Sequence, residues 1–76
     1  MANFIDYKLF IEINPEVRFG KPVIKDTRIT VYDVLGWLAS GLTHEAIMED
    51  FPQLKEEHIL ACLAFVTNRE RKLKVK

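Results

Sequence analysis

The stretch TVYDVLGWLASGLT, residues 30–43, determines the fold that the flanking segments must adopt. Its first four residues form a capping box, in which the Thr30 hydroxyl and the Asp33 carboxylate each accept a hydrogen bond from a free backbone N–H group. Gly41 ends the helix as a left-handed cap. Between these signals, apolar side chains recur at the helical spacing i, i+3, i+4 and i+7, at Val31, Val34, Leu35 and Leu38.

Two further helices are predicted after this one. Thr43 caps the second helix and Pro52 ends it, and the third begins near residues 55–57, where acidic side chains suit a helix start. The third helix is apolar over more than half of its circumference, with a core stripe at Ile59, Cys62, Leu63 and Val66. The face around Leu60, Ala64 and Phe65 is therefore in excess. It is either an interface for a partner or is covered by the N-terminal strands.

Residues 7–29 predict a small β region. Residues 7–13 are rich in β-branched and aromatic side chains, and Leu9, Ile11 and Ile13 alternate onto one face of a strand. Two very short strands at 23–25 and 28–29 are hinged at Asp26, since Asp tolerates left-handed turn geometry. The fold class is thus mainly α with a small β region, in which short N-terminal strands precede a three-helix, helix-turn-helix core.

The 76 residues make one domain, 1–76, with a strand region at 7–29, a helical core at 30–68 and a basic C-terminal tail at 69–76. The single cysteine excludes an intramolecular disulfide. No apolar run approaches the roughly 20 residues that span a membrane, and the N-terminus lacks the features of a signal peptide. We therefore expect a cytoplasmic protein without a membrane partner.

The sequence offers little chemistry. His58 and Cys62 lie one helical turn apart, so a catalytic dyad is geometrically possible, but nothing nearby supplies an oxyanion hole or an orienting acid. Cys62 is interpreted as a core residue. We expect no enzyme: no catalytic residue, no metal site, no cofactor and no small-molecule substrate.

Charge is unevenly distributed along the chain. Residues 1–68 contain six Lys or Arg against ten Asp or Glu, whereas residues 69–76 contain five bases and one acid. Two interpretations stay open for this tail. It is a solvated basic end that suits the negative pole of the third helix, or it is a contact arm for an acidic protein surface or for phosphates.

The second and third helices, joined by residues 51–54, have the proportions of a helix-turn-helix. Glu56 and Glu57 would then face the DNA, which is unfavourable because affinity comes largely from neutralising phosphates. The residues left as candidate DNA contacts are Lys21, Lys25, Arg28, Lys55 and His58.

Two side chains are hard to assign. Arg28 stands between apolar neighbours, where a salt bridge to Asp26, Asp33 or Glu16 accounts for it as well as a binding role does. Trp37 lies off the apolar stripe of the first helix and is either core or an anchor for a partner.

Several motifs together carry a family resemblance: Asn14-Pro15-Glu16, Gly20-Lys21-Pro22-Val23-Ile24, Thr27-Arg28-Ile29-Thr30-Val31, Leu38-Ala39-Ser40-Gly41-Leu42-Thr43 and Phe51-Pro52-Gln53-Leu54. With them, residues 13–66 resemble the bacterial and archaeal family catalogued as domain of unknown function 433, which includes VapB-type antitoxins. Two positions depart from the family pattern. Asp26 stands where Gly is usual, and Lys55 stands where a Ser or Thr cap is usual.

The resemblance implies a homeodomain-like helical core and a role as the antitoxin of a type II toxin–antitoxin system. Such a protein binds and inhibits a PIN-like ribonuclease toxin encoded next door, often represses its own operon at operator DNA, and is expected to be a homodimer. From charge, we infer that the basic arm suits a carboxylate-lined nuclease cleft. The expected toxin contacts are Phe65, Arg69, Arg71, Lys72 and Lys74.

Two alternatives remain beside the antitoxin hypothesis. One is a stand-alone helix-turn-helix transcription regulator, and the other is a homo-oligomeric adaptor with no toxin.

Overall fold

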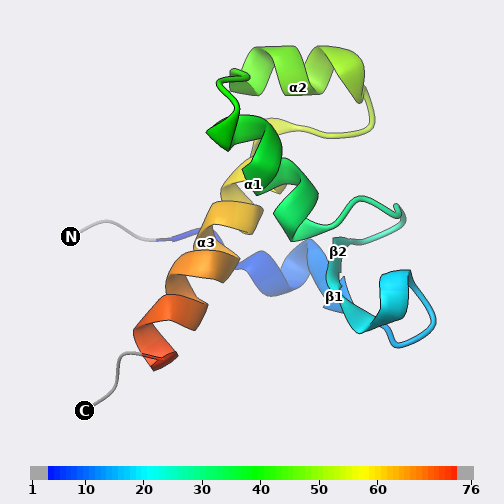
Figure 1. Cartoon of the computed structure of the whole chain (residues 1–76), viewed down its shortest axis with the longest axis vertical. Coiled ribbons are helices and arrows are strands. Elements are labelled where there is room, and N and C mark those ends of the chain that lie inside the picture. Colours follow the sequence, from blue (N-terminus) through cyan, green and yellow to red (C-terminus); the bar gives the residue numbers. More distant parts are fainter. Residues whose placement is uncertain (1–3, 74–76) are drawn as a thin grey trace.

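The computed structural model of the chain describes residues 4–73, with side chains through Glu70. Three helices pack beside a two-stranded antiparallel sheet, α1 (Val31–Ala39), α2 (His44–Asp50) and α3 (Glu56–Leu73) beside β1 (Ile11–Ile13) and β2 (Pro22–Ile24) (Figure 1). Short 3-10 helices, η1 (Tyr7–Leu9) and η2 (Arg18–Gly20), precede the two strands. The predicted fold class, mainly α with a small β region, is confirmed.

Local caps define where α1 and α2 begin. The Asp33 backbone N–H donates to the Thr30 hydroxyl at 2.9 Å, and the Thr30 N–H donates to the Asp33 carboxylate at 3.0 Å. The capping box is therefore formed as predicted. Gly41 takes a φ of 103°, which only glycine adopts readily, and stops the chain's first α-helix. Thr43 accepts from the Ala46 N–H at 3.1 Å and begins α2.

The start of α3 uses a different cap. The Lys55 N–H donates to the Nδ1 atom of His58 at 2.8 Å, so the histidine ring takes the place of the Glu or Gln of a capping box. Glu56 also contacts His44 at the start of α2, with 2.8 Å between its Oε2 and the imidazole Nδ1. α3 continues to Leu73, so the first residues after 68 extend the helix.

The β region is smaller than the sequence predicted. Residues 7–9 form η1 and not a strand, because the Asp6 carboxylate accepts from the Lys8 N–H at 3.1 Å and caps a helical turn. The predicted strand over 7–13 is thus wrong in its first half. Of the three alternating residues only Ile11 is buried, while Leu9 and Ile13 are 64% and 59% exposed. β1 has only three paired residues, so the strand is too short to bury Leu9 and Ile13 together with Ile11.

Asp26 is the predicted left-handed hinge, with a φ of 65°. The predicted strand at residues 28–29 is wrong, because the chain turns back at once after β2. The Ile24 N–H donates to the Ile29 carbonyl at 2.9 Å, and Val23 forms an isolated bridge with Thr30. After this turn the chain enters α1 at Val31, next to β2.

The core lies where the hairpin and the three helices meet. Its largest fully buried side chains come from every one of these elements except β1: Val23, Ile24, Val31, Val34, Ile47, Ile59 and Cys62. Leu63, predicted in the core stripe, is 37% exposed, since it lies about 100° around α3 from Cys62. Within the described residues, no helix is both long and apolar enough to cross a membrane.

Thr30→Ala tests whether the capping box fixes the start of α1. Thr30 is 2% exposed and its hydroxyl satisfies a helix N–H. We expect the free energy of unfolding to fall by about 1–2 kcal/mol in a urea titration. Thr30→Ser is the matched control, because it keeps the hydroxyl, and it is expected to retain most of the stability. Equal losses in both variants would show that the methyl group matters and the cap does not.

Candidate functional site

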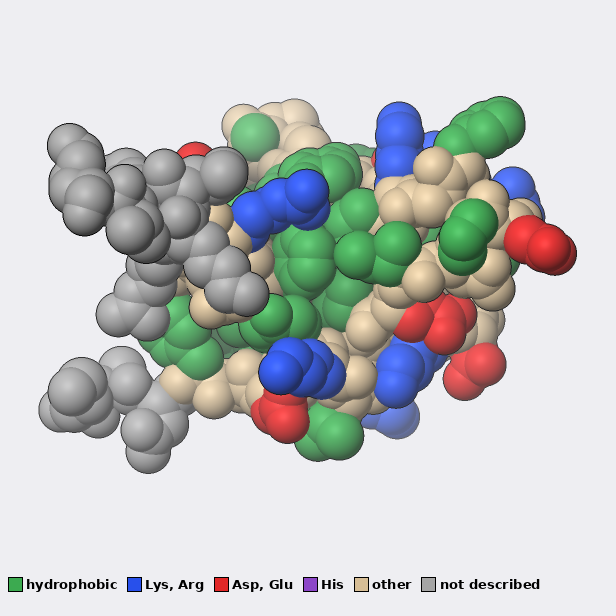
Figure 2. Space-filling view, turned by 90° about the horizontal axis from the view of Figure 1, so that it is seen from below, with side chains coloured by type: hydrophobic (Ala, Val, Ile, Leu, Met, Phe, Trp, Pro, Cys, Tyr) green, Lys and Arg blue, Asp and Glu red, His purple; other side chains and the backbone are tan. Residues whose placement is uncertain are grey.

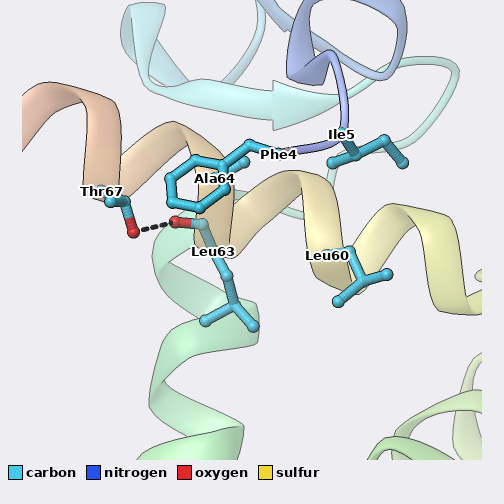
Figure 3. Close-up of a pocket in the computed structure, with 6 residues that line it drawn as sticks. All are labelled: Phe4, Ile5, Leu60, Leu63, Ala64 and Thr67. Carbon is cyan, nitrogen blue, oxygen red and sulfur yellow. Dashed lines mark hydrogen bonds between the residues drawn. The ribbon is translucent and has the colours of Figure 1, made fainter. Parts of the chain in front are cut away.

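An open apolar groove runs between α3 and the N-terminal segment. It has a volume of about 230 Å³ and is lined by Phe4, Ile5, Leu60, Leu63, Ala64 and Thr67. Figure 3 shows Phe4 lying across α3 beside Ala64, with Leu60 and Leu63 projecting from the helix. Leu60 is 40% and Leu63 37% exposed. Two leucines one helical turn apart therefore remain incompletely covered on the face of α3 that points away from the core.

This face differs from the one that the sequence indicated. Of the predicted excess residues, Leu60 is exposed, but Ala64 is buried and Phe65 is half-buried. The N-terminal segment covers them, though it arrives as η1 and an irregular stretch and not as a strand. Coverage by the N-terminal segment thus holds for Ala64 and Phe65, whereas the alternative of a partner interface stays a prediction for the open side of Leu60 and Leu63.

A second cluster, of aromatic and polar side chains, lies around Phe65 further along α3. The Phe65 ring packs edge-on against Tyr7 with 5.3 Å between ring centroids, and the Arg69 guanidinium lies 5.6 Å from the Phe65 centroid. Arg69 also donates from Nη1 to the Tyr32 hydroxyl at 3.3 Å. Asn68 donates to the Tyr7 hydroxyl at 2.8 Å. Phe65 therefore packs inside the fold, whereas Arg69 is exposed and held in one orientation.

The other predicted toxin contacts fall at the end of the helix. Arg71 and Lys72 belong to the helical backbone of α3, but their side chains lie outside the described part of the structure. Lys74 lies beyond the described residues altogether. Figure 1 shows the C-terminal end of α3 projecting away from α2 and from the β-hairpin.

The candidate DNA contacts come from two parts of the chain, the hairpin region and the start of α3. Lys21, Lys25 and Arg28 are exposed in the hairpin region, and no ion pair involves them among residues 4–70. Lys55 and His58 belong to the start of α3, where His58 is half-buried, caps Lys55 and packs edge-on against Phe10 at 5.4 Å. On the face shown in Figure 2, charged side chains of both signs are scattered around hydrophobic ones. This mixture differs from a continuous basic patch.

Arg28 and Trp37 can now be placed. The Arg28 side chain is exposed and makes none of the predicted salt bridges, because Arg18 occupies Asp33 with 3.4 Å between Nη1 and Oδ2. The same Nη1 donates to the Arg28 backbone carbonyl at 2.8 Å. Trp37 is half-buried and stacks on Phe51 with 4.5 Å between centroids, so it packs against the core.

Phe19 is an exposed feature that the sequence reasoning missed. Its side chain is 95% exposed, and its φ of 60° follows a φ of 49° at Arg18. Left-handed geometry costs about 1–2 kcal/mol for a residue other than glycine. The Arg18 contacts to Asp33 and to the Arg28 carbonyl hold the turn in place. The sequence signal for this exposure is that Phe19 directly precedes Gly20 in a turn, between the predicted strands and outside both of them.

The Cys62 thiol is unsuited to nucleophilic chemistry in the folded chain. It is fully buried, and burial raises its pKa to about 12. The neighbouring His58 uses its Nδ1 atom to accept from Lys55. Among the described residues, no group of three or more His, Cys, Asp or Glu side chains is arranged to hold a metal ion.

Burial of Cys62 predicts a loss of stability at alkaline pH. The folded pKa of about 12 lies above the ordinary value of 9.0, so the unfolded chain releases the thiol proton first as pH rises. Stabilisation by the neutral thiol is complete below pH 9 and is lost progressively between pH 9 and 12. We expect urea titrations of wild type and Cys62→Ala to converge over this window. A constant difference between them would contradict the assignment.

Phe19 itself should contribute nothing to folding. Phe19→Asn removes an exposed ring and places at φ 60° a residue that tolerates this geometry. We expect the free energy of unfolding to stay the same or to rise by up to about 1 kcal/mol. Phe51→Asn, which removes a half-buried ring stacked on Trp37, is the control and should cost about 2 kcal/mol. A similar loss in Phe19→Asn would show that the ring packs in solution.

Comparisons with known proteins agree with this architecture. The family model described as "Protein of unknown function (DUF433)" matches residues 11–66. The curated "Uncharacterized protein y4eO" of Sinorhizobium fredii (strain NBRC 101917 / NGR234) is 39% identical over 46 residues, which are 60% of this chain and 21% of that protein. The chain thus spans about a fifth of the length of this relative.

A solved structure has the same fold. The crystal structure of a DUF433 member protein from Anabaena variabilis ATCC 29413 matches with a TM-score of 0.75 and 24% identity, over 82% of this chain and 61% of that one. At this identity the likeness concerns the fold. Because the family model spans well over half of the residues, the chain belongs to the family described as protein of unknown function (DUF433).

Proposed function

We propose that the chain is the antitoxin of a type II toxin–antitoxin system, a non-enzymatic cytoplasmic protein that binds and inhibits a PIN-like ribonuclease encoded next door. The observation that carries the proposal is the basic end of α3. This segment continues the helix to Leu73, and its first base, Arg69, is exposed and already oriented by Phe65 and Tyr32. Residues 69–73 therefore meet a partner as part of a helix, on which Arg69 is already oriented.

The chemistry of the arm suits an acidic cleft. A PIN-like nuclease holds its metal ions with carboxylates, and arginine pairs with carboxylates through two parallel hydrogen bonds. Residues 69–76 contain five bases against one acid, whereas the preceding 68 residues are net acidic. Charge of one sign is thus concentrated in the last residues of the sequence, and such a charge cluster steers association with an acidic surface.

Repression of the operon is the secondary part of the proposal. Contacts to phosphates from the hairpin region are supported by the exposure of Lys21, Lys25 and Arg28, none of which makes an ion pair within residues 4–70. The start of α3 supports DNA binding less well, because Glu56 and Glu57 are exposed there and His58 serves as a cap. A stand-alone regulator that reads DNA with α3 is therefore the weaker hypothesis.

Co-expression with the product of the adjacent gene tests the antitoxin role. We expect the neighbour to arrest growth when expressed alone, and this chain to restore growth and to co-purify with it. Arg69→Glu is expected to weaken the complex at least about ten-fold in a titration by calorimetry. Lys25→Glu is the matched control, since it makes the same charge change at an exposed residue in the hairpin region.

Arg69 also packs on Phe65, so the thermal unfolding of each variant must be measured alongside binding. A harmless neighbour that does not co-purify with the wild-type chain would contradict the antitoxin role. Equal binding by Arg69→Glu and Lys25→Glu would contradict the assignment of the toxin contact to the arm.

A further inference from the structure

We propose that the turn around Phe19 binds single-stranded nucleic acid, with the Phe19 ring stacked on a base and nearby basic side chains on the phosphates. The ring is 95% exposed, which leaves both of its faces open to solvent. It contributes no packing to the fold, so folding alone does not explain why a large apolar side chain stands there. Toxin binding by the C-terminal arm does not involve this ring, and the site is therefore independent of the toxin.

The backbone holds the ring outward in a conformation that phenylalanine disfavours. Arg18, Phe19 and Gly20 have φ values of 49°, 60° and 79°, so three consecutive residues lie in the left-handed region. The Arg18 Nη1 atom braces this turn, because it donates to the Arg28 carbonyl at 2.8 Å and to Asp33 Oδ2 at 3.4 Å. Burial of the ring does not offset the strain, and strain of this kind is typical of binding sites.

Basic side chains are concentrated around the same turn. Of the six bases and ten acids in residues 1–68, four bases but only one acid, Asp26, lie within residues 18–28. Lys21, Lys25 and Arg28 are exposed and make no ion pair within residues 4–70. A local excess of positive charge in an otherwise acidic body favours a partner that carries many negative charges.

The fold brings these bases to the side of the hairpin that carries Phe19. Lys21 directly follows η2, and Lys25 directly follows β2. The Arg18 contact holds the Arg28 carbonyl beside the turn of η2. Figure 1 shows the connection between the two strands and the turn after β2 on the side of the hairpin that faces away from α3. Bases on these two turns can contact the phosphates next to a nucleotide that is stacked on the ring.

A single strand fits this combination better than a duplex does. A base in a single strand offers its flat face to an aromatic ring, whereas a base pair in a duplex must first be unstacked at a cost in free energy. An exposed ring flanked by basic side chains is the general means by which proteins bind single strands without reading their sequence. A protein with an apolar pocket could also take the ring, but the excess of bases matches phosphates better than the mixed charges of a protein surface.

Fluorescence anisotropy of the full chain with a labelled, mixed-sequence DNA strand of about 12 nucleotides tests the site. We expect saturable binding at about 50 mM salt, and a slope of about −2 for the logarithm of the association constant against that of the salt concentration, from three phosphate contacts. An RNA strand of the same sequence should bind alike, because stacking and phosphate contacts do not involve the sugar hydroxyl.

The ring is tested by substitution at Phe19. Phe19→Asn should weaken binding of the DNA strand at least about five-fold. Phe19→Tyr keeps an aromatic ring and should retain most of the affinity. Leu9→Asn is the matched control, because it removes an apolar side chain that is 64% exposed but lies outside residues 18–28. It should bind like wild type. Thermal unfolding of each variant checks that the fold is intact.

The bases are tested by removing one charge at a time. Arg28→Gln should weaken binding and make the salt slope shallower by about 0.7. Lys8→Gln is the matched control, since Lys8 is exposed in η1, and it should change neither quantity.

Two results would overturn the proposal. One is a duplex of the same sequence that wild type and Phe19→Asn bind as tightly as the single strand, which would leave the three bases to operator DNA. The other is a wild-type chain that does not bind the strand at low salt, together with loss of the neighbouring gene product by Phe19→Asn. That result would assign the ring to a pocket of the protein partner instead.

Discussion

The Asp33 carboxylate joins the two halves of this small molecule. Its Oδ2 atom accepts from the Thr30 N–H at 3.0 Å, which starts α1, and from Arg18 Nη1 at 3.4 Å. The same Arg18 nitrogen holds the Arg28 carbonyl at 2.8 Å. One carboxylate thus contacts the first turn of α1 and, through Arg18, ties it to the connection between the two strands and to the turn that follows β2. The Arg18 contacts at this junction offset the backbone strain of the left-handed turn at Arg18 and Phe19.

α3 carries the surface on which the antitoxin proposal depends, and its inward face explains how its other sides are oriented. Ile59, Ala61 and Cys62 are buried against the other elements and set the rotation of the helix. This rotation leaves Leu60 and Leu63 on the groove side and Arg69 on the side of Tyr32. The open leucines and the first base of the C-terminal end therefore lie on different sides of one helix.

Local signals in the sequence predicted the helical part of the fold well. The capping box at Thr30, the stop at Gly41, the cap at Thr43 and the hinge at Asp26 each depend on a few neighbouring residues. The misses depend on contacts between distant residues. Asn68 contacts Tyr7 and Arg69 contacts Tyr32, two residues far away in the sequence. The periodicity of α3 alone therefore predicts neither that Phe65 is covered nor that Leu63 is exposed. For the same reason Phe19 could not be singled out from the sequence, because its exposure depends on where the hairpin turn ends.

The measurement that tests this account most directly is the mass of the intact complex formed with the neighbouring gene product, by native mass spectrometry. The antitoxin account predicts a mass that equals a whole number of copies of this chain plus at least one copy of the neighbouring product. Masses of the two separate proteins alone would contradict the account.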